Sequence, residues 1–180
     1  MSSRQILNNK SFDITINRLC FELIENHNDF SESAIIGLQP RGIYLARRIT
    51  DRLKQFLPGK EIVSGNLDIT FFRDDFRRRE NVIVPSATQI DFIIENKKVI
   101  LVDDVLYTGR TIRAALDAIL AFGRPSKVEL LTFINRKFSR DVPIEPNYVG
   151  KAIDTISSDK VKVSWLETEG KDEVWLFTKE

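Results

Sequence analysis

Apolar runs of strand length alternate along this chain with segments of helical spacing. Residues 34–38 and 99–102 are short, continuously apolar runs, and Lys98 precedes the second; such runs are typical of strands buried on both faces. Residues 43–56 and 111–122 instead place apolar side chains three and four positions apart, as an amphipathic helix does. Strands that alternate with helices predict an α/β fold built on a mostly parallel sheet.

The remaining pattern predicts further elements of lower regularity. Ser11 is expected to cap a first helix whose apolar face includes Ile16 and Cys20. Residues 65–72 alternate like a half-exposed strand. Residues 90–94 are expected to form a hairpin with 98–102, because only three residues separate the two runs.

The C-terminal third predicts one more core strand and a small appendage. Residues 128–134 read as a strand that extends the sheet. Three later runs, residues 148–153, 161–166 and 173–177, are expected to be antiparallel and to form a β hood, which we place mainly at 137–180. Residues 73–89 are long, charged and irregular, which is typical of a mobile lid.

Composition narrows the class without naming a function. The chain has 180 residues, enough for a single domain spanning 1–180, and 42% of them are hydrophobic. Its 27 basic and 26 acidic residues give no global argument for nucleic acid. The N-terminus lacks the apolar core of a signal peptide, and no long apolar span occurs, so we expect a cytoplasmic protein without membrane contact.

Two single residues are given structural interpretations. Cys20 is the only cysteine, which excludes intramolecular disulfides, and its helical spacing favours a small core residue. His27 is the only histidine and stands near the end of the first predicted helix. We therefore interpret His27 as a surface cation rather than a catalyst.

The stretch VILVDDVLYTGRT, residues 99–111, carries the most chemistry. It runs from a buried strand through Asp103 and Asp104 to Thr108-Gly109, where the next helix begins. Ligands of open α/β sheets bind at this edge, and a helix N-terminus with flanking hydroxyls suits a phosphate. The two carboxylates would repel that phosphate, so they are expected to bind sugar hydroxyls, Mg²⁺ or both. The stretch predicts a site for a ribose 5-phosphate.

Other protein classes place aspartate pairs after a strand. A receiver domain would carry its phosphate-accepting aspartate on a different strand, and a nucleotide hydrolase would need G-x-x-x-x-G-K-[ST], which is absent. Helix capping alone explains the threonines but not the aspartates.

The same stretch resembles, almost residue for residue, the phosphoribosyl diphosphate (PRPP) motif of type I phosphoribosyltransferases. More narrowly, the chain resembles the PyrR family of pyrimidine operon attenuators and uracil phosphoribosyltransferases. The segments GLQPRGIYLARRI, LDITFFRDD, GRPSKVELLTFINR and VPIEPNYVGKAI extend the resemblance, in order, over essentially the whole chain. It implies the type I fold, a parallel sheet flanked by helices with a small hood, and the conversion of uracil and PRPP to UMP and diphosphate with Mg²⁺.

The resemblance distributes roles over this chain's residues. Asp103 and Asp104 are expected to orient the ribose and to bind Mg²⁺, partly through the substrate. Arg41 and Arg73 complete the expected catalytic set by binding diphosphate, whereas Arg77, Arg78 and Arg79 are interpreted as a solvated charge run. The ribose and 5-phosphate of PRPP are expected to be bound by residues 103–111, which are Asp103, Asp104, Val105, Leu106, Tyr107, Thr108, Gly109, Arg110 and Thr111. The diphosphate is expected to be bound by Gln39, Pro40, Arg41, Gly42 and Arg73.

The base is expected to be a pyrimidine. Purine-type relatives commonly carry an aspartate where this chain has Tyr107, and a phenol with an ordinary pKa of about 10 is a poor base at neutral pH. Arg136 and the backbone near Lys160 and Val161 are weak candidates for contact with uracil.

A second function class is RNA binding. Regulators of the PyrR family bind pyrimidine leader messenger RNA through a basic face of a dimer, for which Arg18, Arg140 and Lys151 are the candidates here. Glu145 and Phe21 stand where those regulators tend to have basic or imidazole side chains, so we expect enzyme activity to be retained and attenuation to be weakened. A non-catalytic dimer that only senses UMP is a third possibility, and a homodimer or higher homo-oligomer is implied throughout.

Overall fold

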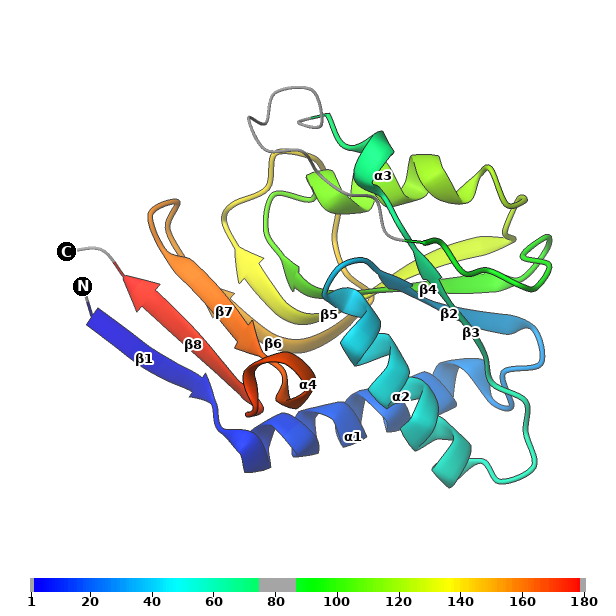
Figure 1. The fold of residues 1–180 in the computed structure, drawn as a ribbon, viewed down its shortest axis with the longest axis horizontal. Helices are drawn as coiled ribbons and strands as arrows, with labels where there is room; N and C mark the ends of the chain where they lie inside the picture. Colours follow the sequence, from blue (N-terminus) through cyan, green and yellow to red (C-terminus); the bar gives the residue numbers. More distant parts are fainter. Residues whose placement is uncertain (1, 75–86, 179–180) are drawn as a thin grey trace.

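A five-stranded parallel sheet forms the centre of the computed structural model, which describes residues 2–74 and 87–178 (Figure 1). Its strands are β2 (Ser33–Leu38), β3 (Val63–Leu67), β4 (Lys98–Leu106), β5 (Lys127–Lys137) and β6 (Tyr148–Asp154). The strand order is β3-β2-β4-β5-β6, and every neighbouring pair is parallel. This architecture confirms the predicted fold class.

Helices cover both faces of this sheet and divide the core into two layers. The helices α1 (Asn9–His27) and α2 (Gly42–Phe56) pack on one face, with Leu19 and Leu45 among their buried side chains. The helix α3 (Arg110–Ile119) covers the other face, where Ile112 and Ala115 pack against β4 and its neighbours. Because β2 and β4 are buried on both faces, residues 34–38 and 99–102 within them are continuously apolar rather than alternating.

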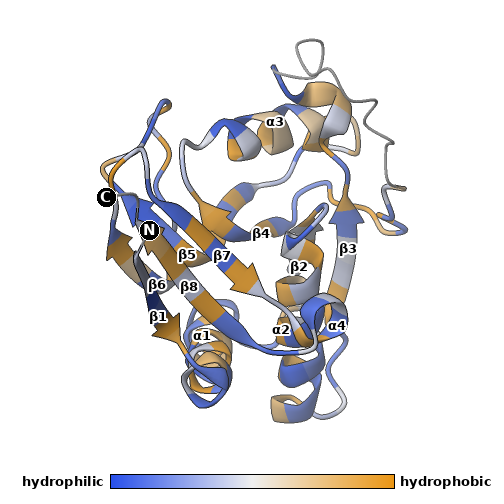
Figure 2. Cartoon of the chain, turned by 60° about the vertical axis from the view of Figure 1, so that its left-hand side comes forward, coloured by the Kyte–Doolittle hydropathy of each residue, from blue (hydrophilic) through white to orange (hydrophobic). Residues whose placement is uncertain are grey.

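A separate three-stranded antiparallel sheet forms the hood. It consists of β7 (Lys160–Ser164), β8 (Glu173–Thr178) and the N-terminal strand β1 (Ser2–Leu7), in the order β1-β8-β7. The turn α4 (Leu166–Glu169) joins β7 to β8, and Figure 2 shows orange and blue residues alternating along these two strands. None of the described helices is long and apolar enough to cross a bilayer.

Three sequence predictions about strands are wrong. Residues 90–94 form no strand, because β4 already has β2 and β5 on its two sides and no edge is left for a hairpin partner. Residues 148–153 do not join the hood, since β6 pairs in parallel with the otherwise open edge of β5. The strand predicted over 65–72 ends at Leu67 and is followed by the 3-10 turn η1 (Thr70–Phe72).

The start of α1 and its end also differ from prediction. The N-cap is Asn8, whose side chain accepts from the Ser11 backbone while Ser11 reaches back to the Asn8 backbone, so Ser11 completes a capping box instead of beginning the helix. His27 is buried rather than a surface cation. Its ring contacts Ser33 Oγ at 2.8 Å and Glu129 Oε2 at 3.0 Å.

Burial decides the protonation of His27. Desolvation lowers the pKa of its imidazole, and the neighbouring Glu129 carboxylate opposes that shift without reversing it. A neutral ring then donates from one nitrogen and accepts at the other, which satisfies Glu129 and Ser33 together. The predicted interpretation of Cys20 is confirmed, because this side chain is fully buried in the core.

Candidate active site

Two strand-to-helix loops meet at the carboxyl edge of neighbouring strands β2 and β4. The loop after β2 holds Gln39 to Arg41, and the loop after β4 holds Tyr107 to Gly109. They approach so closely that a Cβ added at Gly42 would lie 2.3 Å from the carbonyl oxygen of Val102 and 3.0 Å from Cα of Asp103. Glycine is required at position 42 because the first turn of α2 rests against the backbone of β4.

Asp103 and Asp104 are the last charged side chains of β4 and are both buried, with exposed fractions of 8% and 9%. Burial raises the pKa of Asp103 well above its ordinary value, and the adjacent Asp104 charge raises it further. Desolvation also raises the pKa of Asp104, while the Arg41 guanidinium lowers it. Two buried, adjacent carboxylates are electrostatically unfavourable, and a bound cation or hydroxyl donors would lower that unfavourable free energy.

A pocket of about 140 Å³ lies over the start of α3. Gly109, with φ of 86°, precedes the helix and has no side chain to cap it, and it lines this pocket together with Arg110 and Thr111 of the first turn. The Arg110 backbone N–H makes a long contact of 3.4 Å to the Thr108 hydroxyl. A Cβ at Gly109 would lie 2.7 Å from a methyl carbon of Val142, so a larger residue does not fit here. Its lining is Arg73, Asp103, Val105, Leu106, Tyr107, Thr108, Gly109, Arg110 and Thr111.

The loop around this pocket is braced by residues 140–142. The Thr108 carbonyl accepts from the backbone N–H groups of Asp141 and Val142, and the Tyr107 carbonyl accepts from Arg140. Arg110 pairs with Asp141 at 2.8 Å and with Asp74 at 2.6 Å, so its charge is directed away from the pocket floor. The loop is therefore held in its shape before any ligand binds.

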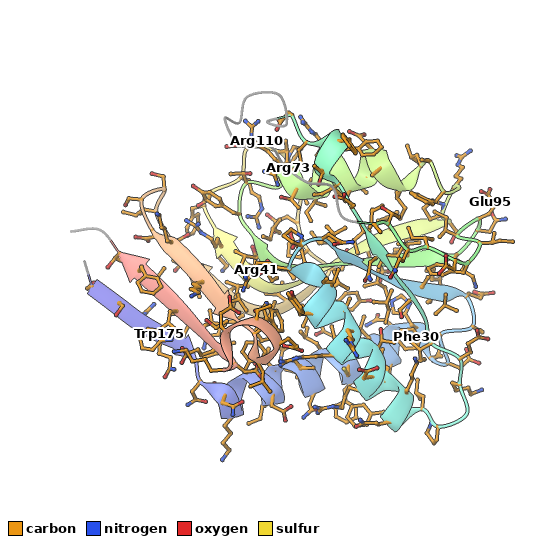
Figure 3. The ribbon with its side chains drawn as sticks, viewed as in Figure 1. Phe30, Arg41, Arg73, Glu95, Arg110 and Trp175 are labelled. Carbon is orange, nitrogen blue, oxygen red and sulfur yellow. The ribbon has the colours of Figure 1, made fainter. Side chains whose placement is uncertain are left out.

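Arg73 reaches the same pocket from the segment after η1. Its guanidinium lies 3.2 Å from Thr111 Oγ1, and its charge lowers the pKa of Asp103 against the larger effect of burial. Figure 3 places Arg73 beside Arg110 near the start of α3. The lid predicted over 73–89 lies largely outside the described residues, as do Arg77, Arg78 and Arg79.

Arg41 stands at the other loop and is engaged by two carboxylates. Its Nε lies 3.1 Å from Asp104 Oδ2, and both terminal nitrogens lie 3.2 Å from Glu169 Oε1. It also donates to the carbonyl of Val163 in β7. Glu169 has the pKa of its carboxyl lowered to about 2, by the Thr168 hydroxyl first and by the Trp165 N–H and Arg41 as well.

Gln39 and Pro40 complete that loop. The Gln39 amide donates to the Ala87 carbonyl at 2.7 Å, and its backbone N–H donates to Leu67. The peptide bond between Gln39 and Pro40 is cis. The residues that the sequence predicts for diphosphate thus lie in this loop and at the start of α2, with the exception of Arg73, which lines the pocket at the start of α3.

The predicted base contacts meet beside Tyr107. The Arg136 guanidinium lies 3.8 Å from the centre of the Tyr107 ring and donates to the Asp159 carbonyl, one residue before Lys160. Lys160 is exposed and Val161 is half-buried. Arg136 therefore connects the loop after β4 with the start of β7 in the hood.

The predicted RNA residues are more dispersed. Arg140 directs its donors into the protein, at Tyr107, Arg136, Ile144 and Asn135. Arg18 is exposed but donates to the carbonyls of Val149 and Gly150. Lys151 and Glu145 are both exposed, and Glu145 lines a pocket together with Arg140.

The residues also bear on a metal ion. Within residues 2–74 and 87–178, no three His, Cys, Asp or Glu side chains gather as a complete cage. Mg²⁺ commonly takes one or two protein carboxylates and completes its shell with water and substrate phosphates. Asp103 and Asp104 fit that mode of binding.

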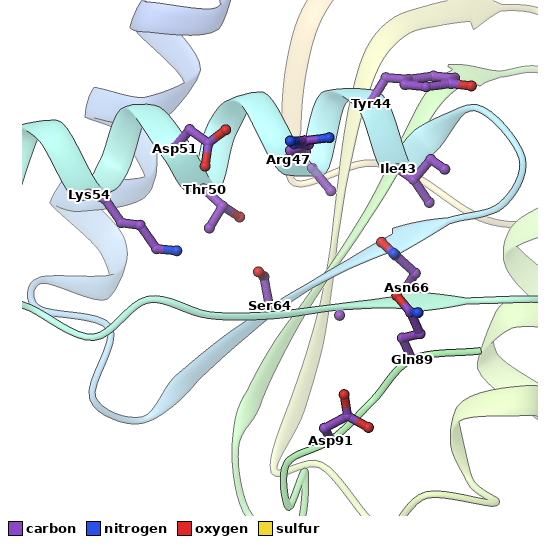
Figure 4. Close-up of a pocket in the computed structure, with 12 residues that line it drawn as sticks. Ile43, Tyr44, Arg47, Thr50, Asp51, Lys54, Ser64, Asn66, Gln89 and Asp91 are labelled. Atoms are coloured by element: carbon purple, nitrogen blue, oxygen red, sulfur yellow. The ribbon is translucent and has the colours of Figure 1, made fainter. Parts of the chain in front are cut away.

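A larger pocket of about 330 Å³ lies elsewhere, between α2 and β3. Figure 4 shows Arg47, Asp51 and Lys54 on the helix above Ser64 and Asn66 of the strand. None of the residues predicted for catalysis or substrate binding lines it.

Comparison with known proteins identifies the family to which this chain belongs. The model of the phosphoribosyl transferase domain matches residues 2–168, so the chain belongs to the phosphoribosyltransferases, which are pentosyltransferases. Within them it belongs to the PyrR family. Proteins named bifunctional protein PyrR from Desulfosudis oleivorans and Streptococcus mutans are 43% and 42% identical to it, over 96% and 100% of this chain and 95% and 98% of theirs.

Solved structures support the fold alone. A hypoxanthine phosphoribosyltransferase from Staphylococcus aureus matches with a TM-score of 0.71 at 17% identity, covering 98% of this chain and 92% of that one. The Leishmania tarentolae enzyme crystallised with GMP matches with a TM-score of 0.72 at 13% identity, covering 100% and 99%.

Sequence reasoning missed Glu169 and the N-terminal strand of the hood. Glu169 lies 128 positions from Arg41, so no local spacing connects the two residues. The segment WLETEG has acidic residues after a strand, which predicts nothing beyond a polar turn. Only the packing of the hood on the core brings Glu169 to the site.

Proposed function

We propose that this protein is a uracil phosphoribosyltransferase that converts uracil and PRPP to UMP and diphosphate. The observation that carries the proposal is the phosphate pocket at the start of α3, directly beside two buried carboxylates. Membership of the PyrR family supports the choice of a pyrimidine base.

The reaction forms a bond between uracil N1 and the anomeric carbon and breaks the bond from that carbon to diphosphate. The N1 proton is lost, and the ribosyl centre passes through an oxocarbenium-like state, by analogy with glycoside cleavage. Such a reaction requires a fixed ribose, stabilisation of the leaving charge and exclusion of water.

The roles of the residues follow from their places. The N–H groups at Thr108 to Thr111 bind the 5-phosphate, while Asp103 and Asp104 accept from the ribose hydroxyls. Arg41 binds the departing diphosphate at the β2 loop, and Arg73, which lines the α3 pocket, reaches the diphosphate only when the site closes. Mg²⁺, held by the carboxylates together with the substrate, supplies charge neutralisation to the diphosphate.

Tyr107 and Arg136 form the side of the site that selects the base. Tyr107 stands where purine-type relatives commonly carry an aspartate, and the Arg136 guanidinium lies 3.8 Å from the centre of its ring. Nε and Nη2 of Arg136 donate to Thr155, Ile156 and Asp159, so this arginine fixes the wall of the site beside Tyr107. Uracil presents two carbonyl oxygens, and its N1 is acidic enough to need no dedicated carboxylate.

The test is a comparison of nucleobases. The protein is incubated with Mg²⁺, PRPP and uracil, hypoxanthine, guanine or adenine in turn, and nucleotide products are separated by chromatography. We expect UMP to form and purine nucleotides to be at least about a hundredfold slower, because an unpaired buried polar group is costly in the wrong complex. A purine product, or binding of UMP without turnover, contradicts the proposal.

RNA attenuation is the second candidate, favoured by the regulatory names of the relatives, such as the pyrimidine operon regulatory protein of Lactococcus lactis. We infer that it is weakened here, because Arg140 is engaged internally and Glu145 is exposed nearby. Gel shifts with the organism's pyrimidine leader RNA, at several salt concentrations with and without UMP, test this inference. Tight binding that depends on UMP would overturn it.

A further inference from the structure

The guanidinium of Arg41 has its donors committed within the protein. Asp104, Glu169 and the Val163 carbonyl accept from Nε and both terminal nitrogens. The side chain remains 36% exposed, so solvent and ligands still reach it. These contacts use four of the five N–H donors of the guanidinium, so no pair of donors remains for a bidentate contact with diphosphate.

Glu169 is fixed by contacts of its own. Its second oxygen, Oε2, accepts from the backbone N–H of Trp165 at 2.9 Å and from the Thr168 hydroxyl, within the same turn. Only Oε1 faces Arg41. The carboxylate therefore keeps its position when Arg41 leaves, which makes the contact reversible.

The neighbouring Arg48 forms ion pairs that, unlike those of Arg41, lie outside the site. Arg48 of α2 binds Glu167 at 2.7 Å and Asp172 at 2.8 Å, and its guanidinium lies 5.2 Å from the Trp165 ring. These contacts attach the turn α4 to α2 without involving either site loop. Loss of the Arg41–Glu169 contact thus leaves the hood attached to the core.

We propose that Glu169 is a positioning residue that holds Arg41 against Asp104 between turnovers and releases it to the diphosphate group of the substrate. The proposal rests on the proposed function, because it assumes that Arg41 binds diphosphate. Glu169 competes with the ligand for the same donors, since one guanidinium does not serve a carboxylate and a diphosphate with the same nitrogens.

The exchange also changes Asp104. When Arg41 turns to the diphosphate, its Nε leaves Asp104 Oδ2, and that oxygen becomes available to a ribose hydroxyl or Mg²⁺. Diphosphate binding and exposure of the second carboxylate are then one event. Arg41 neutralises the buried charge of Asp104 until the substrate provides a replacement.

The experiment uses inorganic diphosphate with Mg²⁺ as the probe, titrated calorimetrically into the full chain. Glu169→Gln retains an oxygen for the Trp165 N–H but removes the charge that competes for Arg41. Glu167→Gln removes a carboxylate from the same turn that pairs only with Arg48, so it is the matched control. The double variant Arg41→Gln/Glu169→Gln, compared with Arg41→Gln, reports whether the effect passes through Arg41.

We expect Glu169→Gln to lower the Kd for diphosphate about two- to fivefold, the range of a partly exposed ion pair. The KM for PRPP falls with it, kcat does not rise, and Glu167→Gln changes neither. In the Arg41→Gln background the effect of Glu169→Gln disappears. Unchanged or weaker diphosphate binding in Glu169→Gln, an equal effect of Glu167→Gln, or persistence of the effect without Arg41 overturns the proposal.

The titration separates this proposal from the proposed function. If the wild type forms no UMP but Glu169→Gln still binds diphosphate more tightly, the uracil assignment fails and the role of Glu169 stands. If UMP forms and diphosphate binding does not respond to Glu169→Gln, the reverse holds.

Discussion

The two ends of the site differ in how ready they are for a ligand. At the α3 end, Gly109 and Thr108 form a pocket whose backbone is braced by Asp141 and Val142 and needs no rearrangement. At the α2 end, Arg41 is already bound to Asp104 and Glu169. The comparison teaches that the backbone donors of an α-helix start need no charged partner, whereas a cation beside buried carboxylates is paired with them, and we propose that a substrate replaces those partners.

The largest expected effect comes from removing both carboxylates that lie between these ends. The change Asp103→Asn with Asp104→Asn should lower kcat/KM for PRPP by at least about a hundredfold, the size typical of losing a charged group that stabilises the transition state. Steady-state kinetics with uracil measures the loss. Circular dichroism should show an intact fold, and a variant with near-normal turnover would remove these residues from the mechanism.

A substitution at Gly109 tests the ready end by itself. In Gly109→Ala, the residue has φ of 86° and its Cβ would meet Val142 at 2.7 Å, so the loop must shift. Strain of about 1.4 kcal/mol, which lies within the usual range for a residue held in such a conformation, should raise the KM for PRPP about tenfold. The Kd for diphosphate, which binds at the other end, should stay unchanged.

Gly59→Ala is the matched control for that experiment. Gly59 also has a positive φ, 79°, but nothing lies within 4 Å of its added Cβ, and it is remote from both loops. It carries the backbone strain without the collision, so it should alter stability but not the KM. Equal KM changes in Gly59→Ala and Gly109→Ala would refute a local effect on the phosphate pocket.

A stability measurement on Asp103 alone sharpens the difference between the ends. Its pKa is raised above the unfolded value of 3.8, so the ionised carboxylate costs stability at every pH above that value. Asp103→Asn should therefore raise the Tm at pH 7, by about 2–4 °C for each kcal/mol relieved. The advantage should vanish as the pH falls below about 4, and a lower Tm at pH 7 would show that the charge is already compensated.

The smallest effect concerns the buried cluster at His27, away from both ends. The pKa of His27 is lowered from 6.5, so its contribution to stability is complete above pH 6.5 and is lost as the pH falls through that value. Thermal unfolding from pH 8 to 5 should show this loss in the wild type and a flatter curve in His27→Gln. Diphosphate affinity at pH 8 should be equal in the two proteins, and a difference would connect this cluster to the site.

Local sequence pattern predicted what depends on local chemistry. The buried strands β2 and β4 could be predicted from their continuous apolar runs. The loop after β4 could be predicted from residue types that are typical of a helix N-terminus. The parallel placement of β6 could not be predicted, because its sequence YVGKAID has neither a continuous apolar run nor a regular alternation, and only the open edge of β5 decides its partner.

The contacts of charged residues were the least predictable part. Arg41 was correctly placed in a loop beside the aspartates, but its partner Glu169 comes from a turn in the hood. His27 was predicted to be exposed because a lone polar residue at a helix end usually is. It is buried because its ring contacts Ser33 of β2 and Glu129 of β5, two strands that lie far from it in the sequence. Such pairs arise from tertiary packing, which periodicity does not encode.

A crystal structure of the protein with Mg²⁺ and PRPP, in the absence of uracil, tests the central claim most directly. We predict that the 5-phosphate lies on the backbone N–H groups of Thr108 to Thr111 and that the ribose hydroxyls and the metal lie at Asp103 and Asp104. We also predict that the diphosphate binds Arg41, with its contact to Glu169 broken. A 5-phosphate bound at the β2 loop, or PRPP bound away from both aspartates, would contradict the account.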